Sequence, residues 1–132
     1  MTEIPTNAIE VTCYHTWQGE DGIVRTKIKP GSEVTIKEAR ENSDAVNSFY
    51  YGTKFPLLID ARGIKSMSRE ARNQFSTKGR ETGAKAFAII IDSSLSRVIG
   101  NFFMGINKPP VPTRLFENEA DAESWLKQID KN

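Results

Sequence analysis

Two aspartates end the two most apolar runs of the sequence, and together they could support chemistry. Residues 55–60 read FPLLID and end at Asp60, and residues 86–92 read AFAIIID and end at Asp92. If the two runs are neighbouring strands, the carboxylates could bind a metal ion or act as an acid–base pair. A hard cation usually needs more oxygen ligands than two carboxylates provide. Strand-end aspartates more often cap loops, so we predict neither a metal site nor a catalytic site here.

Cys13 and His15 are the second pair that could react. They are two residues apart, a spacing that sets side chains next to each other on a strand. A nucleophile and its base must touch, and a third group must orient the base. The sequence offers no such group, so we expect both residues to pack. It also contains no glycine-rich phosphate loop, no GxSxG and no CxxC. We therefore expect a protein without catalytic residues, metal or cofactor.

Basic and hydroxyl side chains that follow the strand ends form the third candidate site. Residues 62–72 read RGIKSMSREAR, and helices that begin near Ser68 and Ser94 would direct their positive dipole ends to the same sheet edge. Such a rim would suit an anion or an acidic partner segment. The alternative is a solvated rim in which the arginines pair with Glu70 and Glu81. The candidate residues for partner or anion binding are Arg62, Gly63, Lys65, Ser66, Ser68, Arg69 and Arg97.

The elements that must position these residues begin with a β-hairpin. Residues 9–18 alternate between apolar and polar side chains, which predicts one half-buried strand with Cys13 and His15 on the same side. Asp21-Gly22 predicts a tight turn, and residues 23–28 form the second strand. Thr35 and Glu38 have the spacing of a capping box and start a helix that runs to about Tyr50. The residues that this helix should bury are Ala39, which Val34 would staple, Val46, Phe49 and Tyr50.

Strands and helices then alternate to the C-terminus. The strand 55–60 is apolar on both faces, a helix begins at Ser68 and is broken by Gly79 and Gly83, and residues 86–91 form a central strand. Ser93 and Ser94 are cap candidates for the next helix. Val111–Phe116 is a short edge strand because Pro112 cannot donate a ladder hydrogen bond. The predicted buried faces of the last two helices comprise Leu95, Val98, Ile99, Phe102, Phe103 and Ile106, and Ala122, Trp125, Leu126 and Ile129.

This order, β-β-α-β-α-β-α-β-α, predicts an α/β domain with a mixed, mostly parallel sheet and an N-terminal hairpin. A length of 132 residues suits one domain, residues 1–132. The net charge of +1 provides no overall field for nucleic acid. The longest apolar run is far shorter than a membrane span, and the N-terminus does not resemble a signal peptide. One cysteine fits a reducing compartment, so we expect a cytoplasmic protein. From the charge and the short apolar runs, we expect neither nucleic acid nor membrane as partner.

Three segments resemble a branch of small uncharacterised bacterial proteins in the SpoIIAA-like superfamily: DGIVRTKIKPG, FPLLIDARGIKSMSREAR and SRVIGNFFMGINKPPVPTRLF. The element order, Asp60, the Gly63 turn and the serine-opened helix resemble the STAS domain. The resemblance covers nearly the whole chain and implies a domain that binds protein partners. In the antagonists of this superfamily, a serine at the start of the second helix is phosphorylated. When Asp60 and Gly63 are aligned with the aspartate and glycine of the family, Arg69 takes the position of the phosphorylated serine. Ser66 and Ser68 flank that position without occupying it.

Two functions remain open. The first is a non-enzymatic, STAS-like interaction module that docks a regulatory protein or kinase through the loop and helix after Asp60, with Ser66 and Ser68 as candidate phosphorylation sites. The second is a small-ligand or lipid-binding domain with a pocket under the helix Leu95–Ile106, because related superfamily folds include lipid carriers. A homodimer is compatible with both. An enzyme that uses Asp60 and Asp92 is the least favoured class.

Overall fold

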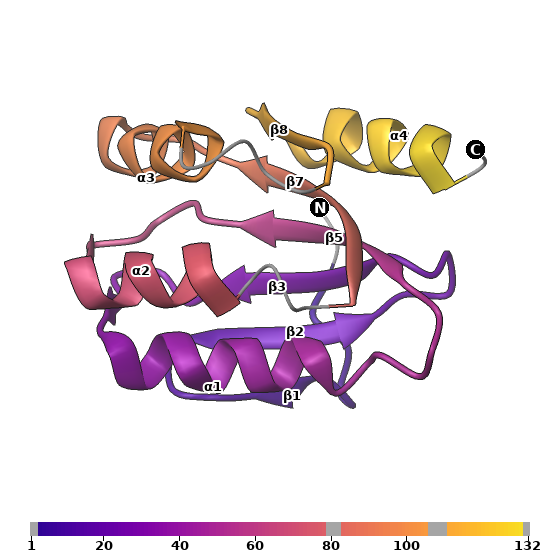
Figure 1. The fold of residues 1–132 in the computed structure, drawn as a ribbon, viewed down its shortest axis with the longest axis horizontal. Coiled ribbons are helices and arrows are strands. Elements are labelled where there is room, and N and C mark those ends of the chain that lie inside the picture. The colour runs from indigo at the N-terminus through magenta and orange to yellow at the C-terminus, as the bar shows by residue number, and fades with distance from the viewer. Residues whose placement is uncertain (1–2, 79–82, 106–110, 131–132) are drawn as a thin grey trace.

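A computed structural model describes residues 3–78, 83–105 and 111–130, and within them the side chains of all residues except 75–78, 102–105 and 130. A six-stranded sheet forms the centre, in the order β1-β2-β3-β5-β7-β8 (Figure 1). Its strands are β1 (Ile9–Glu10), β2 (Tyr14–Gln18), β3 (Val24–Ile28), β5 (Phe55–Asp60), β7 (Ala84–Ile90) and β8 (Thr113–Phe116). The small strands β4 (Glu33–Val34) and β6 (Ser66–Met67) pair with each other. The helices are α1 (Ile36–Asn47), α2 (Arg69–Lys78), α3 (Ser94–Gly105) and α4 (Glu119–Asp130).

The pairing confirms the predicted fold class. The strand β2 runs antiparallel to its neighbours β1 and β3, whereas β3, β5, β7 and β8 run parallel. Apart from the two-residue strands β1, β4 and β6, the order of elements is the predicted one. The hairpin turn has Gly22 at φ +84°, and the N–H of Gly19 donates to the carbonyl of Ile23 at 2.9 Å. No helix in the described residues is long and apolar enough to cross a membrane.

The predicted single strand over residues 9–18 is wrong. The chain reverses at residues 11–13, so that Ile9 lies opposite Thr16 and β1 pairs antiparallel with β2. Alternation cannot reveal this reversal because side chains repeat with period two both before and after the turn. As a consequence, Cys13 packs beside Tyr14 in a buried cluster. Within β2, His15 faces the opposite side from Tyr14 and has the carboxylate of Glu10 at 3.8 Å. Cys13 and His15 therefore do not share a side.

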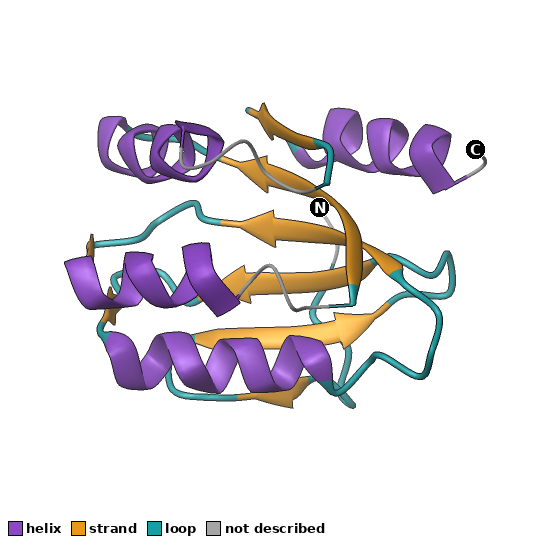
Figure 2. Cartoon of the chain, viewed as in Figure 1, coloured by secondary structure: helices purple, strands orange, loops and turns teal. Residues whose placement is uncertain are grey.

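Helices cover both faces of the sheet (Figure 2). The helices α1 and α2 lie on one face, where α1 packs over β2 and β3. The helix α4 lies on the other face, over β5 and β7, because Ala86 and Ala88 are small enough to let it approach. Ala122 and Leu126 are fully buried against these alanines. The predicted stripe of the last helix is thus confirmed, with Trp125 and Ile129 packed at its margin.

The start of α1 agrees with the sequence, but its end does not. The carboxylate of Glu38 accepts a hydrogen bond from the N–H of Thr35 at 2.9 Å, and Val34 and Ala39 meet in one buried cluster. The helix ends at Asn47, before the predicted end at Tyr50. Tyr50 instead lies in a turn, where its N–H donates to the carbonyl of Asn47. Its predicted burial is wrong, because the residue is 45% exposed.

The predicted wide buried face of the helix 95–106 is also wrong in part. Ile99 is buried as expected, but Leu95 is 37% exposed and Val98 is 56% exposed. The physical reason is that α3 packs at the edge of the sheet, against β8, and not across its centre. At this edge only a narrow side of the helix is covered. Ser96 is fully buried there. The side chains of Phe102 and Phe103, and all of Ile106, lie outside what the structure describes.

The elements around these helices agree with the sequence more closely. β8 is an edge strand, as predicted, but it begins at Thr113 and not at Val111. Pro112 precedes the strand, and its carbonyl accepts a hydrogen bond from the N–H of Phe87 at 2.9 Å. α2 ends at Lys78, and the predicted helix breaker Gly79 lies outside the described residues.

A buried ion cluster fastens α4 to the hairpin. Arg25 is only 5% exposed, and its guanidinium lies 2.9 Å from the carboxylate of Asp21. The same guanidinium binds Glu123 of α4. Hydrogen bonding from Arg25 lowers the pKa of Asp21. Because Arg25 and Glu123 are 98 residues apart in the chain, no local pattern in the sequence points to this contact.

Candidate functional site

The loop between β5 and α2 carries most of the candidate residues, and backbone hydrogen bonds fix its shape. The carbonyl of Gly63 accepts from the N–H of Gly31 at 2.7 Å, and the N–H of Lys65 donates to the carbonyl of Ser32 at 2.9 Å. The short strand β6 then pairs with β4. Gly63 has φ +82°, and a Cβ there would lie 3.3 Å from Cα of Pro30. The loop therefore needs glycine at this position and presents its side chains from a fixed backbone.

Asp60 and Arg62 form the central contact at the start of this loop. Asp60 ends β5 and is 4% exposed. Its carboxylate accepts hydrogen bonds from Nε of Arg62 at 2.9 Å and from Nη2 of Arg62 at 2.7 Å. The ammonium group of Lys27 lies 3.8 Å away. The hydrogen bonds that Arg62 donates to Asp60 raise the pKa of Arg62. Arg62 is thus bound to a buried carboxylate within its own loop.

Asp92 follows the neighbouring strand β7, which ends at Ile90, and it does not pair with Asp60. Its carboxylate accepts from the N–H of Gly63 at 3.4 Å and lies 3.4 Å from the hydroxyl of Ser96. Asp92 therefore connects the two loops that follow β5 and β7. In the part of the chain that the structure describes, no three His, Cys, Asp or Glu side chains gather in a way that could hold a metal ion. Both aspartates act as loop caps here.

The three arginines of the predicted anion rim have different surroundings. Arg62 is held by Asp60, whereas Nη2 of Arg97 lies 3.1 Å from Glu117, which directly follows β8. The strand β7 lies between β5 and β8 in the sheet. The two guanidinium groups are therefore held at the ends of strands that are not neighbours. Arg69 is exposed in the first turn of α2. No described contact brings the three side chains together.

We group the exposed side chains of this region under the name loop–helix surface. Ile99 of α3 packs in the same buried cluster as Ile64 and Ala71, so α3 lies beside the loop and α2 (Figure 1). Leu95 lies one turn before Ile99 on the same side of α3. The exposed or half-exposed residues that define the surface are Lys65, Ser66, Ser68 and Arg69 on the loop and α2, and Leu95 and Val98 on α3. The sequence missed the two apolar members because it predicts them to be buried.

The sequence and the fold both match known families. The family described as domain of unknown function DUF7793 matches residues 17–130. The chain belongs to this family. An uncharacterised DUF3478-family protein from Shewanella loihica PV-4, solved with a SpoIIAA-like fold, resembles this chain with a TM-score of 0.63 and 22% sequence identity. The match covers 86% of this chain and 91% of that chain. No curated protein matches the sequence.

The fold of this DUF7793 domain is SpoIIAA-like, which confirms the fold that the sequence motifs led us to expect. Its mostly parallel sheet and four helices agree with that fold. At 22% identity the similarity shows the fold alone. Partner, ligand and regulation must therefore be argued from the residues of this chain.

The two serines of the DUF7793 loop differ in what their hydroxyl groups do. Ser68 is the N-cap of α2, because its Oγ accepts a hydrogen bond from the N–H of Ala71 at 3.1 Å. Ser93 caps α3 in the same way, since its Oγ accepts from the N–H of Ser96 at 3.1 Å. Both caps agree with the sequence. Ser66 lies in β6 and is exposed, so Ser66 is the more accessible of the two candidate phosphorylation sites.

Replacing Ser68 with alanine should lower the free energy of unfolding by about 1 kcal/mol, because α2 loses its N-cap acceptor. Ser68→Asp should keep most of the stability, since a carboxylate also caps a helix and interacts favourably with its dipole. Ser66→Ala provides the matched control and should change stability by less than about 0.5 kcal/mol. Urea unfolding followed by circular dichroism measures all three. Equal losses for the two alanine variants would contradict the assignment of Ser68 as the cap.

Proposed function

We propose that this domain is a non-enzymatic interaction module that docks a regulatory protein through the loop–helix surface. The observation that carries the proposal is the fixed backbone of residues 63–68 and of the first turn of α2, from which Lys65, Ser66 and Arg69 project into solvent. A loop that is already ordered loses little conformational entropy when a partner binds. Exposed side chains on a loop that a rigid sheet positions are also a common setting for function.

The composition of the surface supports a protein partner. Leu95 and Val98 are exposed aliphatic side chains of α3. Ile99 of the same helix packs with Ile64 and Ala71, which lie close to the exposed residues Lys65 and Arg69 in the chain. An apolar centre with a charged margin is the usual arrangement of a protein–protein interface. The partner that fits best presents an apolar segment with acidic residues at its border. The Asp60–Arg62 contact fixes the start of the loop that carries these basic residues.

Phosphorylation would act directly on this surface. A phosphate on Ser66 would add roughly two negative charges beside Lys65. It would therefore reverse the positive local charge that we propose the partner binds. Ser68 is the second candidate, but its hydroxyl already caps α2. We therefore propose Ser66 as the site at which modification would weaken docking, with Ser66→Asp as its mimic.

The alternative function, a ligand or lipid pocket under the helix Leu95–Ile106, depends mainly on residues 102–106. The side chains of residues 102–105 and the whole of residue 106 lie outside what the structure describes. No described observation favours this alternative, so the experiments below address docking.

The test compares how much partner is captured by variants of the loop–helix surface and by control variants at the opposite end of the sheet. Lys65→Glu/Arg69→Glu should reduce capture at least about tenfold, because a loss of about 1.4 kcal/mol in binding has that effect. Leu95→Asp/Val98→Asp should do the same. The matched controls are Lys54→Glu and Tyr51→Asp, which are exposed and precede β5 at the opposite end of the sheet. Affinity purification from the native cell with quantitative mass spectrometry measures capture.

Thermal unfolding of each variant must accompany this comparison. Arg62→Glu, which also reverses a basic charge of the loop, is unsuitable because it would leave two carboxylates facing each other at Asp60. A photo-crosslinking amino acid at position 65 should also trap the partner, whereas the same probe at position 54 should not. Proteins recovered equally by wild type, surface variants and controls would exclude docking at the loop–helix surface.

A further inference from the structure

The outer edge of β8 presents unpaired backbone groups on a strand that belongs to the central sheet. The N–H of Phe87 donates to the carbonyl of Pro112, and the N–H of Ile91 donates to that of Phe116. In a parallel ladder this register directs the backbone groups of Arg114 and Phe116 to β7 as well. The backbone groups of Thr113 and Leu115 therefore point away from β7. On that outer side, no described strand pairs with β8.

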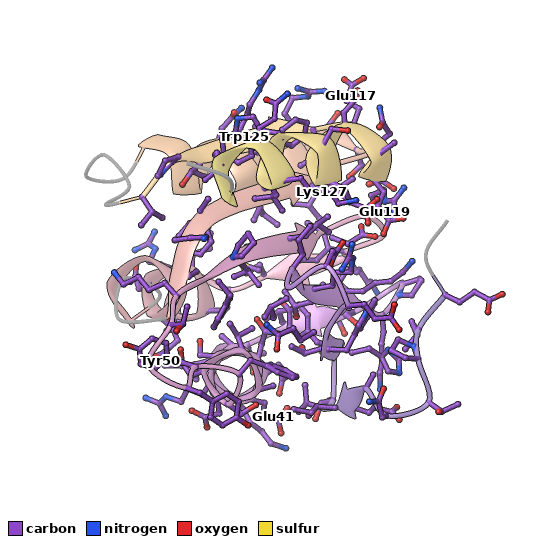
Figure 3. All side chains as sticks on the ribbon, turned by 90° about the vertical axis from the view of Figure 1, so that its right-hand side faces the viewer. Glu41, Tyr50, Glu117, Glu119, Trp125 and Lys127 are labelled. Carbon is purple, nitrogen blue, oxygen red and sulfur yellow. The ribbon has the colours of Figure 1, made fainter. Side chains whose placement is uncertain are left out.

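Large side chains flank this edge on the face that carries α4. The guanidinium of Arg114 lies 5.2 Å from the ring centroid of Phe116, and that ring lies 5.6 Å from the ring of Trp125 on α4. Trp125 and Glu117 occur at the same end of the molecule, opposite Tyr50 and Glu41 (Figure 3). The helix α4 packs mainly over β5 and β7, and α3 lies against the side chain of Leu115 on the other face. No described strand pairs with the outer backbone of β8. Arginine and tryptophan are the residue types most often found at the centres of interfaces.

We infer that two copies of this chain pair through their β8 edges, antiparallel about a two-fold axis at Leu115. This interface is separate from the loop–helix surface and does not depend on the proposed docking function. In an antiparallel pair the residues opposite each other point to the same face of the sheet. With the axis at Leu115, Arg114 of each copy lies opposite Phe116 of the other. Each Phe116 ring then has its own Trp125 on one side and a guanidinium from the second copy beside it.

The alternative register is much less favourable. An axis at Arg114 would set the two arginines directly opposite each other, and like charges in that position destabilise a strand pair. It would also centre the pairing on backbone groups that already bond to β7. The axis at Leu115 instead joins the outward backbone groups of β8. The N–H of each Leu115 donates to the carbonyl of Leu115 in the other copy, and Thr113 of one copy pairs with Glu117 of the other. Pairing would also remove an open edge, which is otherwise a site of uncontrolled association.

The test measures the mass of the full chain by analytical ultracentrifugation over a range of concentrations. Wild type should be dimeric at about 100 µM, the regime of a micromolar dissociation constant. Thr113→Pro removes an outward N–H that no described strand pairs with, so it should weaken dimerisation at least tenfold. Thr113→Ala keeps that N–H and is the matched control, which should remain dimeric. Arg114→Glu should also weaken the dimer, since an anion would face the ring of Phe116.

Hydrogen exchange provides a measurement that needs no variant. The amide of Leu115 should exchange slowly at high concentration and rapidly on dilution, whereas the amide of Ile89 in β7 should stay protected at both. A wild-type chain that remains monomeric at about 100 µM, where a micromolar dimer would be populated, would overturn the inference. A dimer that Thr113→Pro and Arg114→Glu leave unchanged would overturn it too, because the interface would then lie elsewhere.

Discussion

Replacing Arg62 with alanine is expected to lower the free energy of unfolding by about 2–3 kcal/mol, which is large for a residue that the sequence places in a loop. The variant leaves the carboxylate of Asp60 buried at 4% exposure without its two closest donors. Removing one partner of a buried ion pair typically costs about 3–5 kcal/mol. We expect less because Lys27 remains 3.8 Å from Asp60 and the Arg62 side chain is itself 30% exposed.

Arg69→Ala is the matched control for this prediction. Arg69 lies in the same basic loop region but is exposed, so its replacement should change stability by less than about 0.5 kcal/mol. The double variant Asp60→Asn/Arg62→Ala should recover part of the loss, because it leaves no buried charge uncompensated. Urea unfolding distinguishes these outcomes. If Arg62→Ala and Arg69→Ala are equally mild, the Asp60–Arg62 contact does not support the loop.

Replacing Leu126 with alanine is expected to cost about 3 kcal/mol, near the middle of the range for a fully buried leucine. Leu126 has no exposed surface and packs with Ala122 against Ala86 and Ala88. The alanines of β7 cannot expand into the space left, so a cavity should remain. The result tests whether α4 covers the face of the sheet opposite α1.

The matched control is Gln128→Ala, which lies on the exposed side of α4 and should be nearly neutral. Chemical unfolding at two wavelengths measures both variants, one for helix content and one for the tryptophan environment. A loss below about 1 kcal/mol for Leu126→Ala would remove α4 from the core. That outcome would also exclude the position of Trp125 on which the β8 interface depends.

Much of the fold could be predicted because it depends on local patterns. The strand 55–60 follows from an apolar run. The helix start at Thr35 follows from a capping box, whose hydrogen bond joins residues close in sequence. The same reasoning identified Ser68 as a cap. It failed at residues 11–13, where period-two alternation continues across a chain reversal.

The candidate site could be predicted only in outline. The sequence indicated that Arg62, Lys65, Ser66 and Arg69 follow a strand end, and the structure has them there. Which of them remain exposed was not predictable, because Arg62 turns back to Asp60. The exposure of Leu95 and Val98 was predicted incorrectly, because periodicity identifies an apolar side of a helix without showing what covers it.

Interactions over a few residues account for the order of the longer elements, the end of β5 at Asp60 and the caps of α1 and α2. Which charges are paired and which apolar side chains face solvent follows only from the tertiary structure. Arg25 meets Glu123 across 98 positions of the chain, and Gly63 meets Asp92 across 29. Such contacts arise when the strands associate, and the spacing of residues along the chain carries no record of them.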